Sequence, residues 1–223
     1  MDKAFALPVS FHEPKRLKTW QLIAILAAIN LFTIFILNKF ILTREVYYSL
    51  LSSRMEISRI DDYFNMVSKI RAWGYLIVPA ILWLRITVVA LLIQLPLMIK
   101  FIEIPFKQLF RIVAWANVSM IVLSVTQIFY LLKIPASQFT QSTLSFMPLS
   151  LMNFLGNLHF TAAGQGIIKS INIFEFIWAF IIYKGLHGTG KLEKIDSAIV
   201  TLGVWAGMEV FQFALLTYLN KMG

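Results

Sequence analysis

Long apolar stretches are the feature that most constrains this chain. A helix needs about 20 consecutive apolar residues to cross the ~30 Å hydrocarbon core of a bilayer. Such stretches recur, and we expect helices over about residues 20–41, 75–99, 110–132, 167–186 and 198–219. Hydrophobic residues make up 59% of the chain and charged residues only 14%, against about 25% charged residues in a soluble domain. The sequence therefore predicts an all-α, polytopic membrane helical bundle with about five transmembrane helices.

Three other segments complete the expected organisation around a single transmembrane domain of residues 20–223. Residues 1–19 form a basic tail, and the apolar run after it is too long for a signal-peptide core, so we expect a retained anchor. Residues 43–73 combine mixed charge with apolar residues at helical spacing, which predicts an amphipathic helix that lies on the membrane or extends the next helix. Residues 144–158 are apolar but short and contain Pro148, which favours a re-entrant or interfacial segment.

The positive charge of the chain indicates a lipid partner rather than a nucleic acid. The net charge is +9, and the basic residues stand mostly beside apolar runs, where they suit anionic lipid headgroups. With five spans and a cytoplasmic N-terminus, ten basic residues fall on the cytoplasmic side and nine on the other. We therefore expect a multi-pass protein with a cytoplasmic N-terminus.

No recognisable catalytic or metal-binding pattern is present in the sequence. The chain has no cysteine, so thiolate catalysis, iron–sulfur clusters and cysteine-ligated zinc are excluded. Its histidines, His12, His159 and His187, are too far apart in sequence to form a helical metal pair. A nucleophile–base or paired-acid motif of an intramembrane hydrolase is also missing. We expect no enzyme activity, no cofactor and no metal.

Two ionisable residues lie within predicted membrane helices. Arg85 stands near the centre of the 75–99 helix, where a charge costs at least about 2.5–3.5 kcal/mol on insertion scales, so it should face protein or water. Glu209, in the middle of the 198–219 helix, is its expected partner. The pair is either structural and fixes helix packing, or it forms part of an ion, proton or anion site.

Polar residues also follow one face of the 110–132 helix. Ser124 and Gln127 follow Asn117 by seven and ten residues, so the three residues lie on one side of the helix. Such residues usually form hydrogen bonds between membrane helices, and the alternative is that they line a polar cavity. Asn30 and Gln94 are expected to join the same interior.

Two further features have ordinary structural explanations. Gly203 and Gly207 form a G-x-x-x-G pattern, which permits close approach of helices and favours packing within the chain over dimerisation. Glu175 falls in the first turns of the predicted 167–186 helix, where the helix macrodipole favours an acidic side chain.

Three segments of the sequence together carry a family resemblance. A charged amphipathic stretch runs into an apolar helix in IDDYFNMVSKIRAWGYLIVPAI. A short basic loop then opens the next helix as FKQLFRIVAWANVSMIVLSV. The third segment is INIFEFIWAFIIYKGLHG. These segments resemble the Yip family, whose members are membrane proteins named for interacting with Ypt/Rab GTPases. The third segment keeps the family spacing of Asn172, Phe174 and Gly185, with Trp178 one residue later than the pattern.

The resemblance covers roughly residues 40–220 and implies five spans, a cytoplasmic N-terminus and a role in membrane organisation or trafficking. The tail of about 19 residues is closer to the compact bacterial members than to eukaryotic ones with long polar tails. This implies the bacterial cytoplasmic (inner) membrane as the location.

Two functions follow from the sequence. The first is a non-enzymatic Yip-like membrane protein that organises the membrane or a membrane-protein partner, using its helices and the 43–73 stretch. The alternative is a small transporter or channel subunit with a polar intramembrane cavity around Arg85 and Glu209. A cavity that reaches Arg85 would favour transport, whereas a dry contact between Arg85 and Glu209 would favour the organising role.

Overall fold

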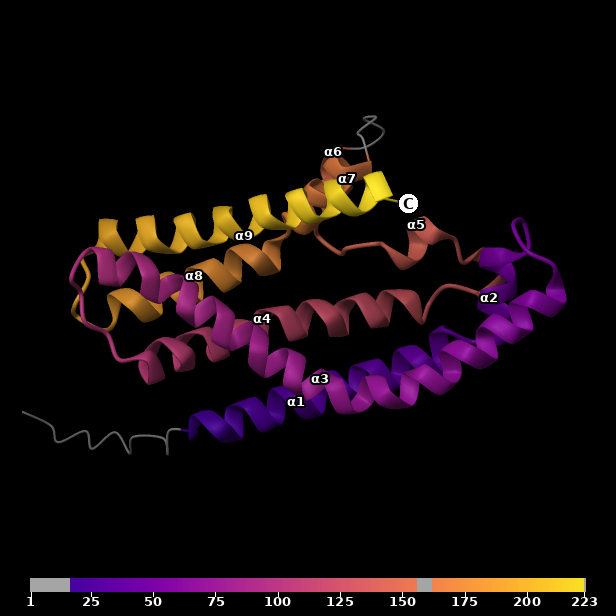
Figure 1. The fold of residues 1–223 in the computed structure, drawn as a ribbon, viewed down its shortest axis with the longest axis horizontal. Coiled ribbons are helices and arrows are strands. Elements are labelled where there is room, and N and C mark those ends of the chain that lie inside the picture. The colour runs from indigo at the N-terminus through magenta and orange to yellow at the C-terminus, as the bar shows by residue number, and fades with distance from the viewer. Residues whose placement is uncertain (1–16, 156–161, 223) are drawn as a thin grey trace, which may run out of the picture.

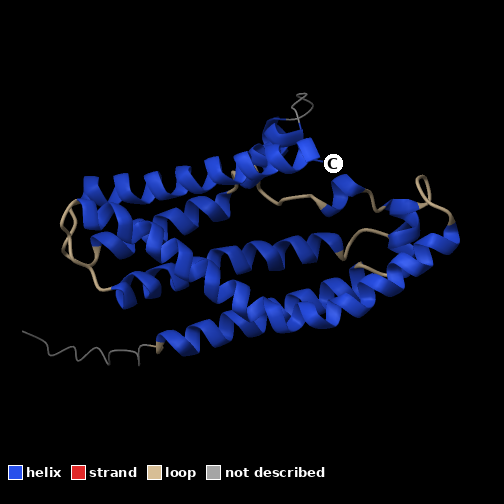
Figure 2. Ribbon diagram, in the orientation of Figure 1, coloured by secondary structure: helices blue, strands red, loops and turns tan. Residues whose placement is uncertain are grey.

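The computed structural model describes residues 17–155 and 162–222, and their regular structure is helical (Figures 1 and 2). The long helices are α1 (Thr19–Ile36), continued by a π-helical turn (Leu37–Ile41), then α3 (Ile57–Ile99), α4 (Phe106–Leu131), α8 (Ile173–His187) and α9 (Lys194–Met222). The shorter elements are α2 (Arg44–Leu51), a 3₁₀ turn (Ala136–Gln138), α5 (Gln141–Leu144), α6 (Met152–Leu155) and α7 (Ala162–Ser170).

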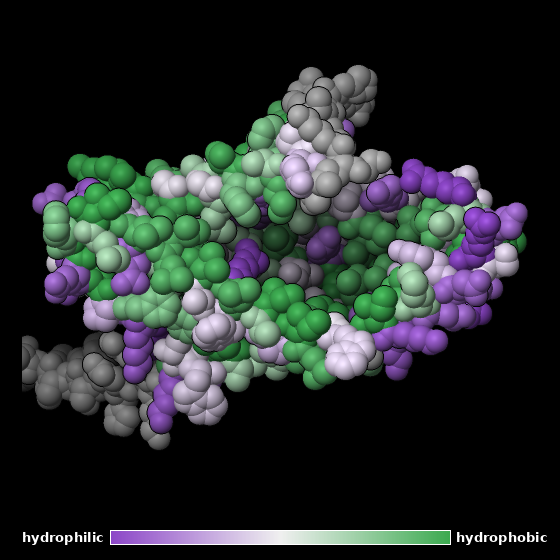
Figure 3. Space-filling view, viewed as in Figure 1, coloured by the Kyte–Doolittle hydropathy of each residue, from purple (hydrophilic) through white to green (hydrophobic). Residues whose placement is uncertain are grey.

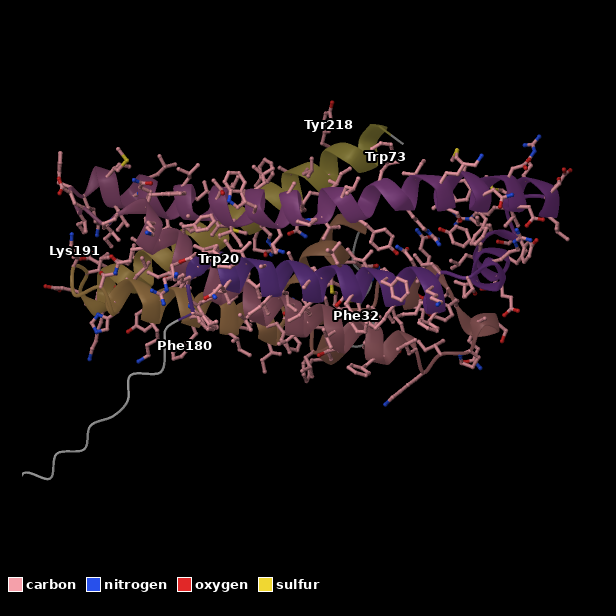
Figure 4. The ribbon with its side chains drawn as sticks, turned by 90° about the horizontal axis from the view of Figure 1, so that it is seen from below. Trp20, Phe32, Trp73, Phe180, Lys191 and Tyr218 are labelled. Atoms are coloured by element: carbon pink, nitrogen blue, oxygen red, sulfur yellow. The ribbon has the colours of Figure 1, made fainter. Side chains whose placement is uncertain are left out.

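Within the described residues, four helices are long and apolar enough to cross a membrane. They are Thr19–Ile41, Trp73–Ile99, Phe106–Leu131 and Lys194–Leu215, and they coincide with four of the five helices expected from the sequence. Many of their large apolar side chains are exposed, as Figure 4 illustrates at Trp20 and Phe32, which are 65% and 63% exposed. Because water would not tolerate so much apolar surface, the four helices indicate a membrane-embedded, multi-pass protein.

The segment expected to form the remaining helix is divided in two. The chain leaves the helical conformation at Ile171 and Asn172, between α7 and α8, so the predicted continuous helix over 167–186 is corrected. The 15 residues of α8 are fewer than the roughly 20 that a straight span needs. Both α7 and α8 pack against α9 (Figure 1).

The charged stretch before the second predicted span extends that span. Residues 57–72 are the first turns of α3, and α2 folds back against them. With 43 residues, α3 is about 65 Å long, roughly twice the thickness of the hydrocarbon core. We call α2 together with residues 57–72 the peripheral arm. The basic tail over residues 1–19 lies outside the described residues except for its last three.

The packed core is centred on α4, which contacts α1, α3 and α8. Trp178, Ile182 and Leu186 of α8 are fully buried and belong to the same cluster as Val113 and Leu109 of α4. Gly185 lies within this contact, where a Cβ atom would overlap Cγ2 of Ile112 and lie 3.0 Å from its Cγ1. Glycine at this position therefore allows α4 and α8 to approach closely.

We expect Gly185→Leu to destabilise the protein by about 1–3 kcal/mol, because the added side chain must displace Ile112 from a filled core. Gly203→Leu is the matched control, since a Cβ atom there meets no atom within 4 Å, and we expect a change of about 0.5 kcal/mol or less. Unfolding of both variants in detergent measures the difference. Equal effects of the two substitutions would contradict the packing role of Gly185.

The two glycines of the G-x-x-x-G pattern in α9 are not at a close contact with another described helix. Gly203 and Gly207 are both exposed, and a Cβ atom at either would meet nothing within 4 Å. The expectation that they pack within the chain is therefore corrected. The close helix–helix contact in this fold is made by Gly185 instead.

Candidate intramembrane cavity

The break between α7 and α8 is stabilised by a second stretch of irregular backbone. The amide of Leu151 donates to the carbonyl of Ile171 at 2.8 Å, and the amide of Ile173 donates to the carbonyl of Leu149 at 3.3 Å. These bonds form an isolated antiparallel bridge between Ser150 and Asn172. Backbone groups released by a helix break at membrane depth need such partners, because lipid offers none. The described part of the predicted 144–158 segment thus folds against the break.

Asn172 fixes the start of α8. Its side chain is 3% exposed, and its Oδ1 accepts hydrogen bonds from the amides of Phe174 (2.9 Å) and Glu175 (3.1 Å). Its Nδ2 donates to the carbonyl of Ser170 at 2.7 Å. One side chain therefore caps α8 and holds the last turn of α7.

We expect Asn172→Ala to cost about 1–2 kcal/mol of stability, because two amides at the start of α8 lose their acceptor in the interior. Asn172→Ser keeps a capping acceptor without adding a charge and should restore part of the loss. Thermal unfolding in detergent compares the variants. A Ser variant no more stable than the Ala variant would show that the bond from Nδ2 to Ser170, rather than the cap, is what matters.

A cavity of about 270 Å³ lies beside the helix break. It is bounded by α1, α3, α4, α8 and α9, together with the chain around Met147 and Ser170. Figure 3 shows a hollow in the middle of one face, where hydrophilic side chains appear among hydrophobic ones. The polar residues that line the cavity are Asn30, Arg85, Asn117, Ser124, Gln127, Ser170, Asn172, Glu175 and Gln212. Its volume is close to the lower end of the range for small-molecule sites.

Arg85 reaches this cavity from the middle of the Trp73–Ile99 span. Among the described residues, its guanidinium has no hydrogen bond and no carboxylate oxygen within 4 Å. The acidic residue that interacts electrostatically with it is Glu175. The expected pairing of Arg85 with Glu209 is therefore wrong. Glu175, which was expected only to interact favourably with the helix macrodipole, lines the cavity.

Glu209 belongs to the same polar group through its contact with Glu175. The carboxyl group of Glu175 is in hydrogen-bonding contact with that of Glu209 and accepts a bond from Nε1 of Trp205 at 2.9 Å. The hydroxyl of Ser170 donates to Oε2 of Glu209 at 2.6 Å. Three helices, α7, α8 and α9, thus converge on two carboxyl groups beside the cavity.

The polar face of α4 also lines the cavity. Asn117, Ser124 and Gln127 are all in its wall. We expected these residues to form hydrogen bonds between helices, but two of them do not. Asn117 donates to the carbonyl of Val113 (2.9 Å) and Ser124 donates to the carbonyl of Met120 (3.0 Å). Both bonds stay within α4. Gln127 alone reaches another segment, donating to the carbonyl of Phe146 at 3.0 Å.

No histidine in the described part of the chain lines the cavity. Among the described residues, no group of three His, Cys, Asp or Glu side chains could hold a metal ion. The Nδ1 atom of His187 lies 3.2 Å from the carbonyl of Leu192, at the far end of α8. His12 and His159 lie outside the described residues.

Comparison of the chain with known proteins finds no matching family model, no matching curated protein and no matching solved structure. The similarity to the Yip family therefore stays a prediction from the three sequence segments.

Proposed function

We propose that this protein is a small transporter or channel subunit that binds a polar solute in the cavity at Arg85. The observation that carries the proposal is an arginine in the middle of a candidate span that lines a polar cavity and has no ion pair within 4 Å among the described residues. A charge at that depth is costly unless it faces protein or water, and such residues commonly mark binding or conduction pathways. A purely structural arginine would be expected to contact its counter-ion directly.

The broken helix supports the same proposal. We infer that α7 and α8 together form a fifth, discontinuous span, which completes the five expected from the sequence. Transporters commonly place their binding sites where helices are interrupted near the middle of the bilayer. Here the interruption at Ile171 and Asn172 adjoins the cavity, because Ser170, Asn172 and Glu175 all line it.

The distribution of basic residues supports a cytoplasmic N-terminus. The chain leaves α3, enters α4, leaves α8 and enters α9 at the end of the bundle where α1 begins (Figure 1). The basic residues of those connections are Lys100, Lys107, Arg111, Lys184, Lys191 and Lys194. Since the chain has no cysteine, a single cysteine can be introduced at Lys191. We expect this cysteine not to react with an impermeant thiol reagent added outside intact bacterial cells. Rapid labelling would show that the orientation is the opposite one.

The test of the proposed function is uptake into liposomes that contain the purified protein. The probes are radiolabelled inorganic phosphate, glycine and phosphoethanolamine, which cross bare lipid slowly. We expect uptake of at least one probe, reduced about tenfold or more in Asn117→Leu, because a leucine replaces a polar wall with an apolar one. Ser119→Ala is the control: Ser119 is buried in the same helix and bonds only to the carbonyl of Ala116. Equal uptake by the wild type and the Asn117→Leu variant would contradict the proposal.

The peripheral arm supports the second function, organisation of a membrane or membrane-protein partner. Arg71 donates to the hydroxyl of Tyr47 at 2.9 Å and lies over the ring of Phe64, where Arg44 also lies. The hydrogen bond to Asp61 raises the pKa of Tyr48 on the same arm. This packing holds the arm rigid beyond the core of the bundle.

The outer surface of the arm carries apolar side chains that are more than half exposed. Ile57 and Ile70 are 68% and 59% exposed, and Met66 is also exposed. If the arm organises a partner, Met66→Glu should abolish copurification of a defined membrane protein and leave probe uptake unchanged. Copurification that survives Met66→Glu and Ile70→Glu together would argue against this function.

A further inference from the structure

The cavity opens sideways between α3 and α9. At one end of the bundle these helices are joined, because Lys100 forms an ion pair with Asp196. Away from that end α3 leaves α9 and packs along α1, where Nδ2 of Asn38 donates to the hydroxyl of Tyr75 at 3.2 Å. The two helices therefore diverge from a closed end, as Figure 1 shows. Both are candidate membrane spans over this region.

Polar residues from both helices lie at the opening. Arg85 on α3 and Gln212 on α9 both line the cavity and both are exposed. Their neighbours on the same helices are exposed apolar residues, including Leu84 (55%) and Phe211 (70%). Because these flanking side chains belong at the level of the acyl chains, the opening faces lipid rather than water. A ligand can reach Arg85 from within the bilayer.

The charges in the cavity wall select the chemistry of the ligand. Among the described residues, the wall carries one guanidinium, on Arg85, and one carboxyl group, on Glu175. Glu209 lies behind Glu175, held by Ser170, and Lys169 is directed to the hydroxyl of Ser145. A head that carries an anionic group and an ammonium group complements both wall charges, and it adds no net charge to a site of low dielectric constant.

We propose that the cavity binds an amphiphile with a zwitterionic head that enters from the bilayer between α3 and α9. Its phosphate or carboxylate is held at Arg85 and its ammonium at Glu175, and its acyl chains stay in the lipid beside Leu84 and Phe211. A volume of about 270 Å³ accommodates a head group and excludes the chains. This inference rests on the proposed function and names its substrate class.

The first experiment measures which lipid the purified protein retains. The full chain is reconstituted in bilayers of equal parts phosphatidylethanolamine and phosphatidylglycerol, released, and weighed by native mass spectrometry. We expect one tightly held phosphatidylethanolamine per chain, in about tenfold preference over phosphatidylglycerol. Glu175→Gln should shift the preference toward phosphatidylglycerol, because the ammonium loses its acidic partner. That change of preference is a gain, so a misfolded variant does not imitate it.

Arg85→Leu should lose both lipids, and Arg85→Lys should retain phosphatidylethanolamine because the positive charge remains. Arg59→Leu is the matched control on the same helix, since Arg59 is exposed on the peripheral arm and away from the cavity wall. Preference of the wild type for phosphatidylglycerol, or a preference unmoved by Glu175→Gln, would overturn the zwitterionic assignment.

Soluble phosphoethanolamine separates this inference from the proposed function. We expect it to bind at least about tenfold more weakly than the intact lipid, because it lacks the chains that remain beside the opening. If the soluble head binds and the lipid does not, the cavity takes a water-borne solute, and the lipid proposal fails while the proposed function stands. If neither the lipid nor any soluble probe binds, both fail.

Discussion

Arg85→Leu is expected to separate stability from function more sharply than any other substitution in the chain. Ligand binding should weaken about 10- to 100-fold, because a charged hydrogen-bond donor contributes about 1.5–3 kcal/mol. Stability should stay the same or rise, since removing a charge from the middle of a span relieves an insertion cost of about 2.5–3.5 kcal/mol. Binding of the probe that the wild type takes up and unfolding in the same detergent provide the two measurements.

The result distinguishes the two roles that the sequence left open for Arg85. If this arginine were one half of a structural ion pair, its removal would leave a carboxylate uncompensated and lower stability by about 3–5 kcal/mol. The structure gives it no carboxylate oxygen within 4 Å among the described residues. A strongly destabilised Arg85→Leu that keeps its ligand would therefore reject the binding role. Arg85→Lys, with the charge retained, is the control for the loss of side-chain volume.

The membrane architecture was predictable because span length is a property of composition. Four helices found in the structure match expected segments, since a run of about 20 apolar residues has few alternatives to a membrane helix. The continuation of α3 before its candidate span was one of two possibilities offered by the amphipathic 43–73 stretch. Periodicity alone could not decide between them, because an amphipathic helix has the same pattern on a membrane surface and in a protein interface.

The break at Ile171 was not predicted, and the error in that helix carried over to the site. Apolar residues continue on both sides of the break, at Ile168, Ile171 and Ile173, so hydropathy alone does not locate it. The local signal was Asn172, a favourable N-cap residue that accepts two amides of α8. When the helix was expected to start at residue 167, Glu175 fell in its first turns near the membrane boundary, where the helix macrodipole favours an acidic side chain. With the start at Ile173, the same carboxyl group lines the cavity beside Arg85.

The polar residues of α4 were identified from spacing, but their partners were not. Asn117, Ser124 and Gln127 share one face, as a helical period requires. Whether a polar side chain bonds to a neighbouring helix or to its own backbone depends on the distance to that helix, which the sequence does not contain. Asn117 bonds to its own helix and leaves its amide beside a cavity. Gln212 carried no signal beyond its polarity, because its role depends on how α3 and α9 diverge.

Trp178→Ala is expected to produce the largest loss of stability, about 3 kcal/mol. Trp178 is 2% exposed and lies in the core cluster that joins α8 to α4. In a membrane the separated helix keeps its apolar side chains in lipid, so the loss comes from the cavity and the missing packing contacts rather than from transfer out of water. Equilibrium unfolding in mixed micelles measures it.

Trp178→Phe tests the effect of the indole N–H separately from most of the packing. The indole Nε1 of Trp178 is buried and has no hydrogen-bond partner among the described residues, so the native residue already bears a desolvation cost of about 1–3 kcal/mol. Phenylalanine removes that unsatisfied donor while leaving a smaller void than alanine, and the two effects oppose each other. We expect a net change within about 1 kcal/mol. A Phe variant as unstable as the Ala variant would show that the indole N–H is bonded in the folded protein, and that α8 is positioned by polarity as well as by packing.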